Sequence, residues 1–142
     1  MRGSDGFTLV ELLLVVALLG IVASTVAVGV TSGDAGARLA DARAAVREID
    51  AVARAAAPRA GQLALRVEEC AFVLRREPGG EVLAERALPE GFGAELVTAA
   101  GDRSVVFERQ GTSPSYSVLL RGGGSVVDLV VNGRTGWIGV PR

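Results

Sequence analysis

The sequence predicts an α+β protein, with a long amino-terminal helix packed on a small antiparallel β-sheet domain. Residues 12–30 form an apolar run without a charged residue, and residues 33–57 continue with small apolar residues at alternating steps of three and four, the spacing of one helix face. After residue 61, short apolar runs alternate with clusters of Gly, Pro, Asn and Ser, a pattern typical of antiparallel strands joined by turns.

The composition of the 142 residues narrows the possible functions. All fifteen basic residues are Arg, and the chain has no Lys and no His. A Walker-type phosphate loop needs a Lys, and Ser-His-Asp catalysis or a His-based zinc site needs a His, so these chemistries are excluded. The formal net charge of -1 gives no overall basic field for nucleic acid. We therefore expect a protein that is not an enzyme and has no cofactor.

Two smaller signals concern possible ligands. Apart from the isolated Asp102 and Asp128, the sequence has no acidic loop with the spacing of calcium ligands, so we expect no metal site. The one cysteine, Cys70, cannot form an internal disulfide. We expect Cys70 to be a small apolar side chain in or near the core.

The apolar run at 12–30 is nineteen residues long, which nearly crosses a bilayer at about 1.5 Å rise per residue. A secretory signal peptide cleaved near 23–25 would need a basic leader, but Arg2 is opposed by Asp5. An ordinary single-pass anchor explains the length and leaves Glu11 unexplained, because a carboxylate in a membrane segment is costly and usually functional.

Residues 6–11, GFTLVE, carry a more specific order: a glycine, an aromatic, a hydroxyl and an acid ahead of the apolar helix. This order resembles the type IV prepilin (class III signal) pattern. The resemblance implies that prepilin peptidase cuts between Gly6 and Phe7 and methylates the new amino group of Phe7. Residues 1–6 are then a leader, and residues 7–32 stay as a transmembrane and filament-core helix.

Cleavage after Gly6 would explain Glu11. The new positive amine at Phe7 would lie four residues from the carboxylate, on the same helix face, and each charge would reduce the cost of burying the other. A carboxylate in the first helical turn also suits the helix dipole. The resemblance implies a further role, in which Glu11 meets the amine of a neighbouring subunit during filament assembly. Both pairings remain open.

The second half of the predicted helix, 33–57, is amphipathic and is expected in the periplasm. Pro58 and Gly61 are expected to stop it, and Asp50 and Arg54 are expected to pair on its exposed side. Its apolar stripe packs either on the protein's own β domain or on neighbouring subunits. The stripe consists of Leu39, Ala42, Val46, Ile49, Ala53 and Ala56.

Residues 58–142 are expected to form the β-rich globular domain. A hairpin is predicted around residues 78–80, and the helix stripe would supply the core that so small a domain lacks. Strands are expected near 63–67, 70–77, 81–88, 94–98, 104–108, 116–121, 125–131 and 137–140.

The strands and glycine turns of 104–140 resemble the globular domain of H-type minor pseudopilins of type II secretion and their pilus relatives, the GspH/FimT family. This resemblance implies a pilin-like fold and a structural pseudopilus subunit for protein export. The protein would be a single-pass protein of the bacterial inner membrane with its β domain in the periplasm. Its implied partners are minor and major pseudopilins, prepilin peptidase and the inner-membrane assembly platform, with the secretin or a secreted substrate as further candidates.

Two alternatives remain. One is a minor type IV pilin for pilus assembly or DNA uptake, in which Arg134 and Arg142 would contact DNA weakly. Some pilus-associated relatives carry Gly-Arg-x-Arg, but here Gly136 stands where the second Arg would be, so we expect no strong nucleic acid binding. The other is a membrane-anchored β domain with an unrelated binding role.

Overall fold

The computed structural model describes residues 9–141, which form one helix and eight strands. The chain divides into two compact units, Met1–Ala37 and Arg38–Arg142. The elements are α1 (Leu9–Ala60), β1 (Leu63–Glu68), β2 (Ala71–Arg76), β3 (Val82–Ala87), β4 (Phe92–Thr98), β5 (Ser104–Phe107), β6 (Tyr116–Gly122), β7 (Ser125–Val131) and β8 (Ile138–Gly139).

Helix α1 passes Pro58 and ends directly before Gly61, the two residues that were expected to stop it. Pro58 lies inside its last turn, and the helix ends at Ala60. The missing N–H of Pro58 removes one hydrogen bond, but the helix ends only where Gly61 takes a left-handed conformation (φ 91°). The Gly61 N–H donates to Ala57 O at 2.9 Å, as is usual at a helix carboxyl end. The helix therefore extends three residues beyond the approximate end expected at residue 57 and stops at the second of the two expected residues.

Within the described residues, no helix combines the length and the apolar character needed to cross a membrane.

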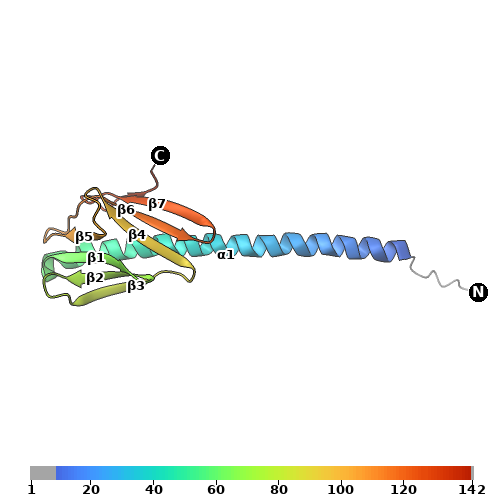
Figure 1. The fold of residues 1–142 in the computed structure, drawn as a ribbon, viewed down its shortest axis with the longest axis horizontal. Helices are drawn as coiled ribbons and strands as arrows, with labels where there is room; N and C mark the ends of the chain where they lie inside the picture. Colours follow the sequence, from blue (N-terminus) through green and yellow to red (C-terminus); the bar gives the residue numbers. More distant parts are fainter. Residues whose placement is uncertain (1–8, 142) are drawn as a thin grey trace, which may run out of the picture. The chain divides into compact units, whose positions relative to one another are not determined.

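The strands of the second unit form two four-stranded sheets among the described residues, in the orders β3-β2-β1-β5 and β4-β6-β7-β8. Every pairing is antiparallel, as the sequence predicted. The predicted hairpin is β2 and β3, which pair from Ala71 with Ala87 to Arg75 with Val82. Figure 1 shows both sheets beside the carboxy-terminal part of α1, with β6 and β7 on one side and β2 and β3 on the other.

The core of the second unit lies between this part of α1 and the two sheets. Four members of the predicted stripe, from Ala42 to Ala53, are buried, and Leu39 and Ala56 pack at the edge. Small Ala side chains let the strands approach the helix closely, and Leu and Phe side chains from both sheets fill the remaining space. The stripe therefore packs on the protein's own β domain. The largest fully buried side chains are Phe72, Phe107, Leu63, Leu65, Leu74, Leu96 and Leu120.

Cys70 does not belong to this core. It lies in the turn between β1 and β2 and is exposed. The neighbouring Glu69 takes a left-handed conformation (φ 53°) as the chain reverses within two residues, which turns residue 70 away from the sheet. The prediction that Cys70 lies in or near the core was wrong.

Candidate functional site

The most connected polar group in the described chain is the Arg54 cluster, formed by Asp50, Arg54 and Tyr116. Arg54 Nε donates to Asp50 Oδ2 at 2.7 Å, and Arg54 Nη2 donates to Asp50 Oδ1 at 3.2 Å. Tyr116 OH donates to Asp50 Oδ1 at 2.9 Å. Asp50 is only 3% exposed, so its charge depends on these donors for compensation.

The same guanidinium binds backbone carbonyls from two loops. Arg54 Nη1 donates to Gly133 O at 2.8 Å and to Gly111 O at 3.2 Å, and Nη2 donates to Asn132 O at 3.3 Å. Its Cζ also lies 5.6 Å from the centroid of the Phe107 ring. The cluster thereby joins α1 to the β5–β6 loop and to the turn before β8.

The pairing of Asp50 with Arg54 was predicted correctly, but its place was not. The sequence suggested the exposed side of the helix, whereas the pair faces the loops and is largely buried. Two glycines make room for it. A Cβ on Gly111 would lie 2.8 Å from Arg54 O, and a Cβ on Gly136 would lie 2.9 Å from Arg54 Nε.

Burial and the neighbouring Asp50 carboxylate raise the pKa of Tyr116 far above the ordinary value of 10.0. Tyr116 is the one tyrosine of the chain, so tyrosinate absorbance reports on it alone. We expect the folded full-length chain in detergent to show almost no tyrosinate at pH 11, where a free tyrosine is about 90% ionised.

The same shift predicts how stability varies with pH. Above about pH 10 the unfolded state loses the tyrosine proton that the native state keeps, so the free energy of unfolding falls as the pH rises. Tyr116→Phe should make this alkaline loss shallower. A tyrosinate midpoint near pH 10 in a chain that is still folded would contradict the buried geometry.

The segment from Asn132 to Trp137 forms a compact turn on the Arg54 cluster. Asn132 Oδ1 accepts from the N–H groups of Arg134 and Thr135 at 3.0 and 3.1 Å. Asn132 N donates to Trp137 O at 2.8 Å. The side chain of Arg134 is exposed at this turn, as a DNA contact would require.

The other predicted site residues lie at or beyond the limits of the described chain. Gly6, Phe7 and Arg142 are outside residues 9–141. Glu11 lies in α1, close to its first described residue, Leu9. The structure therefore does not test the predicted pairing of Glu11 with an amine at Phe7.

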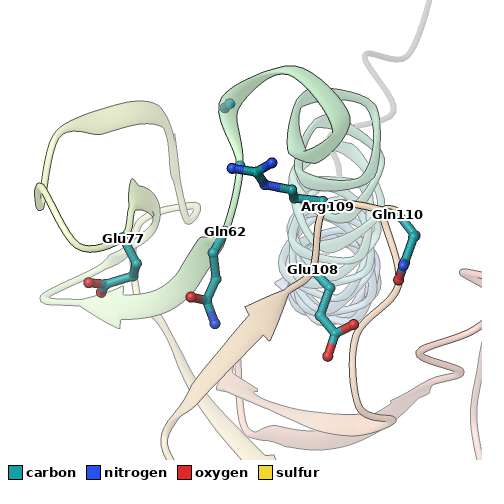
Figure 2. Close-up of a pocket in the computed structure, with 7 residues that line it drawn as sticks. Gln62, Glu77, Glu108, Arg109 and Gln110 are labelled. Atoms are coloured by element: carbon teal, nitrogen blue, oxygen red, sulfur yellow. The ribbon is translucent and has the colours of Figure 1, made fainter.

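An open pocket of about 510 Å³ lies at the carboxyl end of α1. Figure 2 shows that the labelled side chains spread around the opening instead of converging on one point. Glu77 is held by Arg66, with Nη2 and Oε1 3.2 Å apart. The labelled residues are Gln62, Glu77, Glu108, Arg109 and Gln110. Within residues 9–141, no group of three or more His, Cys, Asp or Glu is placed to hold a metal ion.

The sequence and the fold each have a counterpart among known proteins. Residues 1–27 match the prokaryotic N-terminal methylation motif. The fold is similar to the crystal structure of the type IV minor pilin FimU of Pseudomonas aeruginosa (strain PAO1), with a TM-score of 0.52. The likeness covers 72% of this chain and 89% of that one at 13% identity. No curated protein matches the sequence.

The fold of this chain is type IV pilin-like. The amino-terminal motif and the structural likeness support this independently, because the motif covers residues 1–27 and most of the structural likeness must lie beyond it. The predicted pilin-like α+β fold, a long helix packed on antiparallel sheet, is confirmed. In this pilin-like chain the motif indicates that the amino-terminal region is anchored in a membrane. At 13% identity the comparison establishes the fold and does not separate a pseudopilin from a pilus subunit.

Proposed function

We propose that this pilin-like chain is a structural, non-enzymatic minor subunit of a short filament, a minor pseudopilin of type II secretion. The observation that carries the proposal is the joint presence of the N-terminal methylation motif and the fold of a minor pilin in one chain. The β domain would face the periplasm and contact other subunits, the secretin or a secreted substrate. The N-terminal methylation motif supports processing at Phe7 by a separate enzyme, prepilin peptidase.

The second candidate is a minor type IV pilin. It is favoured by the solved structure that the fold resembles, which is a pilus minor pilin. Both candidates share the same processing and the same insertion into a filament. They differ in whether the filament exports protein or builds a surface pilus.

DNA uptake has less support. Among the described residues, the turn 132–137 offers one exposed base, Arg134, for a phosphate, and a few such contacts bind weakly at physiological salt. An electrophoretic shift assay on the full chain in detergent distinguishes this alternative. Tight, salt-sensitive binding would favour it over the structural role.

Glu11→Ala tests the proposed function. We expect the variant to be processed normally but to lose co-purification with partner subunits, because the methylated amine of Phe7 would no longer find a carboxylate where water is scarce. The amount of the variant chain recovered in the filament fraction, either sheared from cells or isolated with membranes, should fall by at least about tenfold. This holds if the lost ion pair contributes more than about 1.4 kcal/mol to assembly. The measurement is quantitative immunoblotting of that fraction.

Mass spectrometry of the mature amino terminus is the control. Both chains should begin with N-methyl-Phe7, which separates failed assembly from failed processing. Glu90→Ala, at an exposed acid of the β domain, should assemble normally. A mature chain that begins at Met1 or near Ser24 would refute the pilin-like processing, and normal assembly of Glu11→Ala would refute the role of Glu11.

A further inference from the structure

The outward face of the sheet β4-β6-β7-β8 has features that neither the fold nor the filament helix explains. In this sheet, Leu129, Val131 and Ile138 point into the core, so alternate residues point outward. The strand register then places Glu95 beside Leu119 and Leu119 beside Asp128, with Val97, Ser117, Val130 and Gly139 in the next row. We call this surface the outer face. It comprises Glu95, Val97, Leu119, Arg121, Val126, Asp128, Val130 and Trp137.

Large apolar side chains are exposed on the outer face. Val126 is 66% exposed and Trp137 is 63% exposed, and Val97 is also exposed. Apolar side chains that cluster on one face of a small protein mark an interaction site more often than scattered ones do. Tryptophan in particular is enriched among the residues that dominate binding energy.

The Trp137 ring is held in place although it is exposed. It lies over Gly139, where a Cβ would overlap the ring atoms. Its backbone is fixed by two hydrogen bonds, from Asn132 N to Trp137 O at 2.8 Å and from Trp137 N to Thr135 Oγ1 at 3.3 Å. A side chain that is already fixed loses little conformational entropy when it binds.

Asp128 supplies the polar feature of the same face. Its Oδ1 is buried and has no hydrogen-bond partner among the described residues. A buried carboxylate oxygen without a donor is costly, and a cation from outside would remove that cost. The other charges on this face are Glu95 and Arg121, whose Oε2 and Nη2 are 3.6 Å apart. Glu95 and Arg121 offset each other, so the Asp128 carboxylate is left to be complemented by a positive group.

We propose that the outer face binds a partner protein that presents an Arg or Lys side chain to Asp128, with flanking apolar side chains that cover Trp137 and Val126. The negative charge of Asp128 favours a positively charged partner over an anionic one. A nucleic acid or an anionic lipid headgroup would be repelled by Asp128 and Glu95. A face that paired with its own copy would offer Asp128 only the same acidic and apolar side chains, because its base, Arg121, is already paired with Glu95. The inferred occupant is therefore a different polypeptide. The inference does not depend on the proposed function.

Site-specific photocrosslinking in the producing bacterium tests the outer face. The full chain carries benzoylphenylalanine in place of the exposed Val126, and mass spectrometry identifies the crosslinked residue. We expect a crosslink to another polypeptide, in a segment that contains an Arg or Lys. Asp128→Arg should lower the crosslink yield at least about tenfold. Exchanging the partner's basic residue for Asp should restore the yield with Asp128→Arg.

Asp102→Arg is the matched control, because it makes the same charge change at an exposed acid outside the outer face, and it should leave the yield unchanged. Trp137→Ala should lower the yield without changing the thermal unfolding of the chain, since its ring is exposed. The proposal is overturned if Asp128→Arg has no effect or if no protein is crosslinked. Crosslinks only to lipid, to a second copy or to a segment without a base also overturn it. None of these results changes the expected processing at Phe7 or the expected effect of Glu11→Ala, so the two proposals can fail separately.

Discussion

Replacing Arg54 by Ala is expected to lower the free energy of unfolding by about 3–5 kcal/mol, the range for breaking a buried ion pair by removing one partner. The change leaves Asp50, which is 3% exposed, with only one of the three hydrogen bonds described for its carboxylate, the one from the Tyr116 hydroxyl. It also removes the donor that the carbonyls of Gly111, Asn132 and Gly133 share. Chemical unfolding of the full chain in detergent, followed by Trp137 fluorescence, measures the loss.

An ion pair between the same helix and β3 provides the control for Arg54→Ala. Arg86 Nε and Glu48 Oε2 are 2.8 Å apart, but both side chains are about half exposed. Glu48→Gln should therefore cost about 0–1 kcal/mol. Adding Asp50→Asn to Arg54→Ala should recover part of the loss, because it removes the uncompensated charge. A loss below about 1 kcal/mol for Arg54→Ala would contradict the structural role of the Arg54 cluster.

Gly133→Ala is expected to cost about 3 kcal/mol, at the upper end of the range for overpacking. A Cβ at this position would overlap Ser113 O and the backbone of Pro114, and backbone atoms cannot move aside as a flexible side chain can. Shifting Gly133 would also disturb its acceptance from Arg54 Nη1 at 2.8 Å and from Ser113 N at 3.0 Å. Equilibrium unfolding under the same conditions measures this change.

Gly93→Ala is the matched control for Gly133→Ala. A Cβ on Gly93 meets no atom within 4 Å, and its backbone is not left-handed. The substitution should change stability by no more than about 1 kcal/mol, in the stabilising direction, because alanine has fewer unfolded conformations. Equal losses from the two glycine variants would show that the close approach at Gly133 does not limit stability.

The helix and the strands could be predicted from the sequence because each one is marked by a pattern within a short stretch of residues. The stripe on α1 repeats at helical spacing within residues 39–56, and each strand is an apolar run bounded by turn residues. Of the two residues expected to stop α1, Gly61 ends it through its left-handed conformation, whereas Pro58 lies inside the last turn, where a missing N–H matters less. Cys70 misled the prediction because residue type alone does not reveal a tight two-residue turn.

The candidate sites depended on contacts that no local pattern contains. The spacing of Asp50 and Arg54 predicted their pairing, but their burial depends on Tyr116, which lies 66 positions from Asp50, and on carbonyls of two later loops. Asp128 was recognised as an isolated acid. Its unpartnered oxygen and its place on one face with Trp137 emerged only from the register of β7 with its neighbours.

The Arg54 cluster also couples motions that are remote in the chain. The turn 132–137 cannot open without withdrawing carbonyl acceptors from a guanidinium that lies 78 positions from Asn132. Local opening of this turn therefore also breaks hydrogen bonds of Arg54, which adds to the free energy that opening costs. Arg54 of α1 thus helps to hold the turn that carries Trp137 at the surface.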